Sequence, residues 1–330
     1  MTASIPSYSR RSLLLLTSAG LACAAPSLTV SAAERWPAKP VRFFVGAGPG
    51  SAPDVVLRLI ADRLSRRWGQ PVVVENKPGA GGILGTTTAA NAAADGYNFL
   101  FGLGSALAMN QFLYKSLPYN PEKDFAPVVS LGVTPMVIVS SPALPVNSFE
   151  QLIALAKAQP GKVALGTTSK SAAHLTMQSL AQQTGIEFLH AFYKSSPNAF
   201  QDMMGGQVMV FCDALAAVPN LKDPRIRVLA VTAPKRLPGL QHLPAVAETV
   251  PGFASYGWYA IMAPTGTPNE IVASLNADVN EILAQPEVGS RLQELVTFDA
   301  GGTPAKLGTF IQSERERLRL AARAARIEPE

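Results

Sequence analysis

The chain has 330 residues, of which 48% are hydrophobic and 15% charged, so it can bury a large core and has the length of two domains. Lysine and arginine outnumber aspartate and glutamate by 28 to 23, a formal charge of +5. The basic residues are scattered and form no run interleaved with aromatic residues, which excludes nucleic acid from the predicted partners.

Residues 1–33 have the three parts of an export signal. Arg10 and Arg11 precede the apolar run Leu13–Leu16, and the small residues Ser31–Ala33 form a cleavage site. This order predicts a secretory signal peptide that is removed near Ala33. The paired arginines also fit twin-arginine export, and the residues leave that route and the general route open. We expect a soluble mature protein in a bacterial periplasm.

Cleavage changes the charge and the cysteine count. Loss of Arg10 and Arg11 leaves 26 basic against 23 acidic residues, a charge of +3. Cys23 is lost with the signal and Cys212 remains alone, so no internal disulfide is predicted for the mature chain. Its stability must therefore come from packing of the core.

Short apolar runs alternate with helical periods along the mature chain. Strands are predicted at Val41–Val45, Val72–Glu75, Asn98–Gly102, Val133–Val139, Lys162–Leu165, Glu187–His190, Val208–Phe211, Arg227–Val231 and Tyr256–Ala263. Helices are predicted at Asp54–Trp68, Gly82–Ala93, Ser148–Ala158, Ser171–Thr184, Pro197–Met204, Pro268–Ala284 and Pro304–Ala324. This alternation favours an α/β fold with mostly parallel sheets and helices on both faces. Ligands of such sheets bind at loops that follow the carboxyl ends of strands.

The loop 46–51 joins a predicted strand to a predicted helix and is rich in glycine and proline. It offers backbone N–H groups and little side-chain chemistry. The amino end of a helix carries partial positive charge, so this loop can bind an anion without a lysine or an arginine. The alternative is an ordinary turn between a strand and a helix.

Two further loops have the same character. The loop 102–106 follows a predicted strand, and the loop 166–174 follows another strand and opens a helix. Hydroxyls and amides in the latter can hold a carboxylate or a phosphate. The alternative is a helix cap that faces solvent. Three loops of one chemical kind favour a cleft for a small anion.

The chain lacks the patterns of several enzyme classes. Two glycine-rich stretches fail the dinucleotide fingerprint, because Pro53 and Leu84 occupy its last position. No serine is flanked by glycines as in a nucleophile elbow, and the three histidines form no pair at metal-ligand spacing. A lone cysteine such as Cys212 is typically a small buried hydrophobe. We therefore expect a protein that is not an enzyme and uses neither a cofactor nor a metal.

Segments along nearly the whole mature chain carry a family resemblance. They are Trp36–Arg42, the first loop through Asp54, Gln70–Gly82, Ala94–Tyr97, Leu117–Phe125, His190–Lys194, Leu229–Thr232 and Ala263–Pro268. Together and in this order, they resemble the Bug family of periplasmic solute-binding proteins, the receptors of tripartite tricarboxylate transporters. Each segment alone is unspecific, and the combination is specific.

The resemblance implies a two-lobed type II periplasmic-binding-protein fold, a Venus flytrap. We expect one lobe at 34–135 together with 258–330, and the other at 136–257. The hinge is expected near Val133–Ser140 and Ser255–Ala260.

The resemblance also implies which residues contact the ligand. They are Ala47, Gly48, Pro49, Gly50, Ser51, Ala52 and Asp54 in the first loop, Ser105 in the second, Thr167, Thr168 and Ser169 in the third, and Tyr193 and Asp213, whose positions face the cleft in the family. Asp54 has an alternative role in shaping the loop and the helix start. The alternative for Tyr193 is a packed aromatic ring.

The first loop departs from the family at two positions. Ser51 stands where the family usually has its second glycine, and Pro53 replaces a threonine and removes one N–H donor. Lys170 adds charge to the third loop. These departures leave the identity and the pose of the ligand open.

The predicted function is capture of a small organic carboxylate or dicarboxylate by lobe closure, for delivery to transporter membrane subunits. The protein is expected to be a monomer. Two alternatives stay open, an extracytoplasmic sensor that passes ligand status to a signalling kinase and, with less support, a periplasmic hydrolase.

Overall fold

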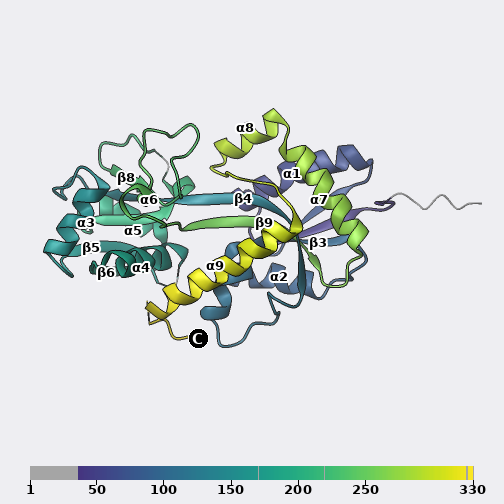
Figure 1. Ribbon diagram of the computed structural model, residues 1–330, viewed down its shortest axis with the longest axis horizontal. Helices are drawn as coiled ribbons and strands as arrows, with labels where there is room; N and C mark the ends of the chain where they lie inside the picture. The colour runs from purple at the N-terminus through teal and green to yellow at the C-terminus, as the bar shows by residue number, and fades with distance from the viewer. Residues whose placement is uncertain (1–35, 170, 219, 325, 330) are drawn as a thin grey trace, which may run out of the picture. The chain divides into compact units, whose positions relative to one another are not determined.

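The computed structural model describes residues 36–169, 171–218, 220–324 and 326–329 (Figure 1). The predicted signal peptide at 1–33, its cleavage point and Lys170 lie outside these residues. Pro37–Glu330 forms one structural unit, to which the helices and strands below belong.

The strands of this unit form a sheet in the order β2-β1-β3-β9-β4-β7-β5-β6, and β8 pairs with β4. Their bounds are β1 (Val41–Val45), β2 (Val72–Asn76), β3 (Asn98–Leu103), β4 (Phe125–Ser140), β5 (Val163–Thr168), β6 (Phe188–Tyr193), β7 (Val210–Ala214), β8 (Arg227–Val231) and β9 (Tyr256–Pro264). The α-helices are α1 (Ala52–Trp68), α2 (Ile83–Ala90), α3 (Phe149–Ala158), α4 (Ala172–Thr184), α5 (Ser196–Met204), α6 (Val246–Thr249), α7 (Asn269–Leu283), α8 (Pro286–Glu294) and α9 (Pro304–Ala324).

Strand β4 joins two sheet halves. Its residues Phe125–Pro135 pair antiparallel with β9, and Met136–Ser140 pair antiparallel with β7 and β8. On one side β1 pairs parallel with β2 and β3, and on the other β5 pairs parallel with β6 and β7. We call β1, β2, β3 and β9 the first half, and β5 to β8 the second half. Helices flank this mixed sheet, as the sequence predicted (Figure 1).

Helices cover both faces of the second half. Phe149 of α3 and Met177 of α4 belong to the buried cluster on one face. Ala199 and Met203 of α5 belong to a second buried cluster that contains Phe211 of β7. The apolar stripe of each helix therefore faces the sheet, which is the arrangement that its spacing predicts.

Helix α9 is shared by the two halves. Its Leu307 and Ile311 share a buried cluster with Leu100 of the first half, and the same cluster contains Leu318 of α9 and Leu175 of α4. Figure 1 shows α9 in yellow, running beside β4 and β9.

The segment 295–302, which we call the strap, follows α8 and lies along β4. The amide of Val133 donates to the carbonyl of Phe298 at 2.8 Å, and the amide of Phe298 donates back at 3.0 Å. The amide of Gly301 donates to the carbonyl of Ser130 at 2.9 Å. The Phe298 ring is 7% exposed and lies in the core of the second half. The strap therefore connects α8 to that core.

The sequence predicted these elements with some errors. The predicted strand Val133–Val139 is the end of β4, which begins earlier, at Phe125. Pro127 and Pro135 interrupt its apolar pattern, and proline normally argues against a strand interior. Strands β5, β6 and β7 extend beyond their predicted ends, and α8 was not predicted.

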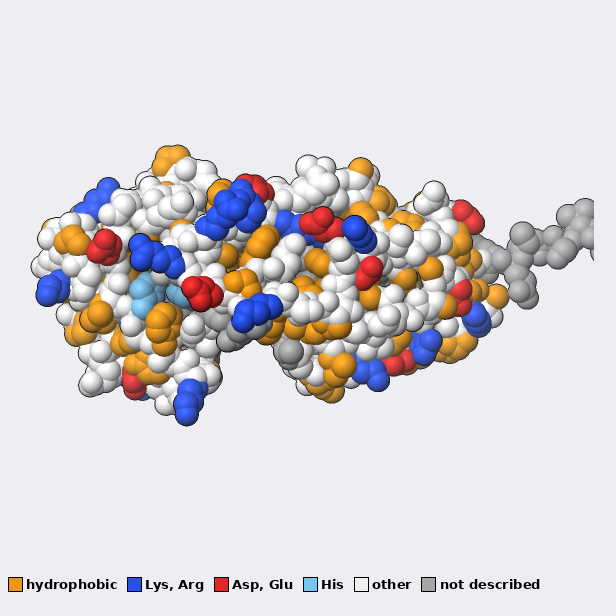
Figure 2. Space-filling model, turned by 90° about the horizontal axis from the view of Figure 1, so that it is seen from below, with side chains coloured by type: hydrophobic (Ala, Val, Ile, Leu, Met, Phe, Trp, Pro, Cys, Tyr) orange, Lys and Arg blue, Asp and Glu red, His pale blue; other side chains and the backbone are white. Residues whose placement is uncertain are grey.

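The predicted lobe bounds, 34–135 with 258–330 and 136–257, stay a prediction, although β4 changes its partners at Pro135 and Met136. Within the described ranges, no helix has the length and the apolar character that crossing a lipid bilayer requires. Figure 2 shows one face of the molecule, on which basic and acidic side chains are interspersed.

Candidate functional site

The first predicted loop connects β1 to α1, and Asp54 fixes its shape. Asp54 is 2% exposed. Its Oδ2 accepts the amide of Gly50 at 2.8 Å, and its Oδ1 accepts Nδ2 of Asn76 at 2.8 Å. Nε of Arg58 donates to Asp54 Oδ2 at 3.0 Å. The carboxylate is therefore occupied within the protein, which supports the role in shaping the loop that the sequence left open.

The pKa of Asp54 reflects these contacts. Burial acts to raise the pKa, but the hydrogen bonds from Arg58, Asn76 and the amide of Gly50 outweigh it and hold the pKa below its usual value. Asp54 is therefore charged at neutral pH.

The backbone of the same loop keeps donors available at the start of α1. The hydroxyl of Ser51 donates to the carbonyl of Gly48 at 2.6 Å and does not cap the helix. The amide of Ser51 also donates to Gly48, at 3.2 Å. Among the residues that the structure describes, the amides of Gly48 and Ala52 donate to no protein acceptor. These N–H groups lie where the helix dipole favours an anion.

Ala52 lines a cavity of about 600 Å³ that we call the α1–β7 cavity. The lining also includes Leu215 and Ala216, which follow directly after β7, and Leu295 and Val296 of the strap. This cavity brings the first predicted loop together with the chain that follows Asp213. The segments 215–221 and 293–298 were not predicted as site residues. The segment 293–298 could have been anticipated from Pro286. Proline favours the first turn of a helix, so Pro286 indicates α8, whose end leads into this segment.

Ser105 lies in the second predicted loop, at the start of a π-helix, Ser105–Met109, that follows β3. Its hydroxyl donates to the carbonyl of Gly81 at 3.1 Å. Ser105 lines a small pocket of about 40 Å³ together with Ala172, the first residue of α4, and Arg317. The structure thus places the second predicted loop close to the start of the helix that the third loop opens.

The third predicted loop is shorter than the sequence suggested. Thr167 and Thr168 are the last residues of β5, which continues past the predicted end at Leu165, and Ser169 follows the strand. Thr167 is 2% exposed, and its hydroxyl has no hydrogen-bond partner within the described residues. Ser171 caps α4 by accepting the amide of His174 at 3.1 Å.

Tyr193 and Asp213 connect their strands to α5. The hydroxyl of Tyr193 donates to Oδ2 of Asp202 at 2.8 Å, and the hydroxyl of Ser196 donates to the carboxylate of Asp213. The other oxygen of Asp213 accepts the amide of Ala214 at 2.6 Å. Tyr193 packs at the edge of the buried cluster beneath α5, and burial, with the nearby Asp202, raises the pKa of its phenol. Both side chains thus have partners on the second half.

The described residues offer little catalytic chemistry. They contain no cluster of three or more histidine, cysteine or acidic side chains that could hold a metal ion. Cys212 is 1% exposed, and burial, with the charge of Asp213, raises the pKa of its thiol. A buried neutral thiol is a poor nucleophile. The arrangement suits binding by backbone amides and hydroxyls better than covalent chemistry.

Comparisons with known proteins show the family of this chain. The family model described as tripartite tricarboxylate transporter family receptor matches residues 56–320. Protein BugT of Bordetella pertussis is 36% identical over 289 residues, which cover 86% of this chain and 89% of BugT.

Two solved structures extend the likeness to the fold. An R. palustris protein solved with adipate is 35% identical, with a TM-score of 0.75, over 89% of this chain and 100% of that one. MatC from Rhodopseudomonas palustris, solved with bound malate, is 28% identical, with a TM-score of 0.68, over 87% of this chain and 99% of MatC. The predicted two-lobed, mixed α/β class of type II periplasmic binding proteins is confirmed.

Proposed function

The chain belongs to the family of receptors of tripartite tricarboxylate transporters, and we propose that it captures a small organic carboxylate or dicarboxylate in the periplasm. Membrane subunits of a transporter of this kind would receive the ligand. The protein would bind without converting its ligand and would act as a monomer. Relatives solved with adipate and with malate support the carboxylate class.

One observation carries this proposal. Ala52, whose amide donates to no acceptor among the described residues, is the first residue of the 17-residue helix α1, and it lines a cavity of about 600 Å³ that is also lined by the chain after β7. A carboxylate in this cavity would accept from the first loop while it touches the second half. The remaining predicted contacts, at Ser105, Thr168 and Ser169, would complete the site.

Closure of the lobes would strengthen these contacts. Water leaves the site as the lobes approach, the local dielectric falls, and each bond from an amide to the anion gains strength. A ligand that contacts both lobes binds the closed arrangement better and shifts the population toward it. The hinge would lie where β4 and β9 pass between the halves, near Val133 and Tyr256.

The first test is a ligand screen on the purified mature protein. Calorimetry should detect adipate, malate or another mono- or dicarboxylate, while the neutral adipamide gives no heat. Small-angle scattering with the best ligand should show a smaller radius of gyration than without it. A complete panel of carboxylates that gives neither heat nor compaction would rule the proposal out.

A pair of variants tests the role of the backbone. Ala52→Pro removes one N–H group at the start of α1, where proline is tolerated, and Ser51 already has the extended backbone that precedes proline (φ −70°, ψ 160°). Loss of a charge-assisted hydrogen bond costs about 1.5–3 kcal/mol, so the dissociation constant should rise about 10- to 100-fold. Ala52→Ser keeps the amide and serves as the control. Equal affinity of the two variants would show that this amide does not bind the ligand.

A further inference from the structure

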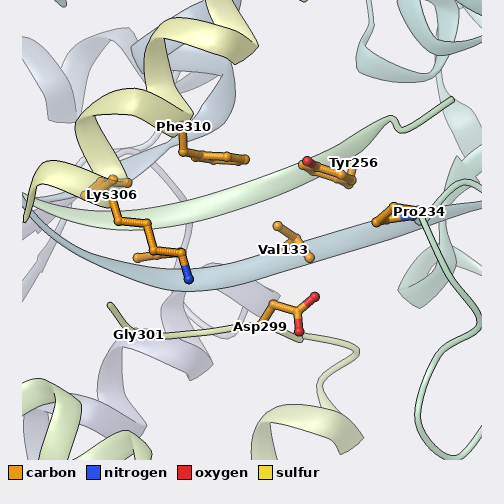
Figure 3. A pocket seen from close by; sticks show the side chains of 9 residues that line it. Val133, Pro234, Tyr256, Asp299, Gly301, Lys306 and Phe310 are labelled. Carbon is orange, nitrogen blue, oxygen red and sulfur yellow. The ribbon is translucent and has the colours of Figure 1, made fainter. Parts of the chain in front are cut away.

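A second cavity, which we call the Lys306 pocket, lies apart from the residues discussed so far. It measures about 190 Å³, and its walls include Val133 of β4, Tyr256 of β9, Asp299 of the strap, and Lys306 and Phe310 of α9. Figure 3 shows Lys306 reaching across β4 toward the segment that carries Asp299 and Gly301, with Tyr256 and Phe310 over β9. None of the predicted ligand residues lines this pocket, and it shares no lining residue with the α1–β7 cavity.

The pocket contains one positive and one negative side chain. Lys306 and Asp299 lie beyond ion-pair distance of each other, and neither forms an ion pair with another of the residues that the structure describes. Both side chains are exposed. The pocket therefore presents two opposite charges that a single ligand could neutralise.

The position of Lys306 favours an anion at one end of the pocket. Lys306 is the third residue of α9, and the amino end of a helix disfavours a cation by about 0.3–1 kcal/mol. A bound carboxylate would interact favourably with the ammonium group and with the helix dipole together. Asp299 lies across the pocket on a backbone with φ of 54°, a conformation that aspartate tolerates better than most residues.

Aromatic rings form the wall between these charges. The rings of Tyr256 and Phe310 stack with their centroids 6.1 Å apart and their planes 13° apart. Trp258 supports Phe310 from the side, with the two rings 5.3 Å apart at 76°. An ammonium group near Asp299 could also contact the face of Tyr256. A cavity of about 150 Å³ is large enough for benzene, so this pocket can hold a molecule with a short carbon skeleton.

We propose that the Lys306 pocket is a second binding site and takes a small zwitterion of the α-amino acid class. The carboxylate of the ligand would face Lys306, its ammonium group would face Asp299, and its apolar part would pack on Tyr256 and Phe310. A dicarboxylate fits poorly, because Asp299 would repel its second charge. The pocket therefore selects against the ligands of the proposed transport site.

The Lys306 pocket lies beside the strands that connect the two sheet halves, and it shares the strap with the α1–β7 cavity. Val133 and Tyr256 lie where β4 and β9 pass between the sheet halves. The strap contributes Leu295, Val296 and Phe298 to the α1–β7 cavity, and Asp299 to the Lys306 pocket. One segment is thus a wall of both cavities, and a ligand in either can affect the other.

The test compares three probes of one skeleton on the purified mature protein. Phenylalanine has both charges, phenylalaninamide lacks the carboxylate, and N-acetylphenylalanine lacks the ammonium group. Calorimetry and saturation-transfer NMR should show that phenylalanine, or leucine as a second amino acid, binds at least 10-fold more tightly than either modified probe.

Two variants locate the binding. Lys306→Met and Asp299→Asn should each weaken binding of phenylalanine at least 10-fold, and the affinity for adipate should stay within two-fold. Lys157→Met, at an exposed lysine of α3, is the control and should change neither. Circular dichroism checks that both pocket variants fold, which their exposed positions favour.

Three results would overturn the proposal: no binding of either amino acid at millimolar concentration, full affinity in both pocket variants, or purely competitive displacement of the amino acid by adipate. If adipate fails to bind while phenylalanine binding depends on Lys306 and Asp299, the transport proposal fails alone and the second site stands.

Discussion

Asp54 shows how one buried side chain can hold a glycine-rich loop in place. Its carboxylate accepts the amide of Gly50 on one oxygen and Asn76 on the other, and Arg58 adds a charged bond. Those bonds hold the loop in a conformation in which the amides of Gly48 and Ala52 donate to no acceptor among the described residues. Pre-organised donors spend less free energy on ordering when an anion binds.

Replacement of Asp54 by asparagine should be costly in a way that depends on pH. Asp54→Asn is expected to lower the free energy of unfolding by about 1–3 kcal/mol at pH 7, because the donors of the exposed Arg58 and the partly buried Asn76 lose their buried, charged acceptor. The pKa of Asp54 is lowered in the folded protein. Its stabilisation is therefore present above the unfolded pKa of about 3.9 and is lost as the pH falls through the folded pKa.

Urea unfolding of wild type and variant at pH 7 and at pH 3 measures this difference, which should shrink at the lower pH. Asp62→Asn is the control in the same helix, since Asp62 pairs with Arg63 and Arg66 at the surface and should matter little. An Asp54 effect that is equally large at both pH values would contradict the interpretation.

At the scale of single residues, the sequence predicted the free backbone amides of the first loop. It did not predict the hydrogen-bond partners of the side chains. Glycine and proline after a β-branched run indicate a turn with free amides whatever the rest of the fold does. The partners of Tyr193 and Asp213 are Asp202 and Ser196 on α5, and they become visible only when the strand ends and the helix meet. Spacing along the chain does not encode those contacts.

The predicted elements differ from the structure where tertiary contacts override a local signal. Strand β4 passes through Pro127, Gly132 and Pro135, residues that normally end a strand. Pairing with β9 on one side and with the strap on the other keeps the chain extended there. In contrast, the predicted helix Ser148–Ala158 agrees with α3 to within one residue, because the cap that Ser148 provides depends on residues only three positions apart.

Gly132 of β4 lies against the strap. Its φ is +106°, and a Cβ atom there would lie 2.6 Å from the carbonyl oxygen of Phe298 and 2.7 Å from Cγ2 of Thr297. Gly132→Ala should therefore lower the free energy of unfolding by more than about 2 kcal/mol, since both the backbone and the strap must move.

The matched control is Gly69→Ala at the end of α1, where φ is +64° and a Cβ atom would meet nothing within 4 Å. Only the backbone strain remains there, so a cost of about 1 kcal/mol is expected. Chemical denaturation of the three proteins gives both values. Similar losses at the two positions would mean that the strap yields easily and does not fix β4.

The two sheet halves are connected by more than the strands β4 and β9, because α9 packs against both. At its centre, Arg317 donates twice to the carboxylate of Glu314, each bond 2.9 Å long, and Glu314 is 4% exposed. Arg317 also donates to the hydroxyl of Ser255 at 3.3 Å, and that hydroxyl lies 2.6 Å from the hydroxyl of Thr176 on α4. A polar chain thus runs from α9 past the start of β9 to the second half.

A buried ion pair of this kind should matter mainly when one partner is removed. Glu314→Gln leaves the partly buried guanidinium of Arg317 without its counter-charge, and the free energy of unfolding should fall by about 3 kcal/mol, the lower end of the range for a buried pair. The double variant Glu314→Leu with Arg317→Leu removes both charges and should recover most of this loss, because apolar groups can replace a buried pair.

The control is Glu316→Gln, which loosens the exposed pair with Arg319 on the same helix and should leave stability almost unchanged. Denaturant unfolding of the four proteins decides the matter, and a double variant as unstable as Glu314→Gln would mean that α9 needs the charges themselves to join the two halves.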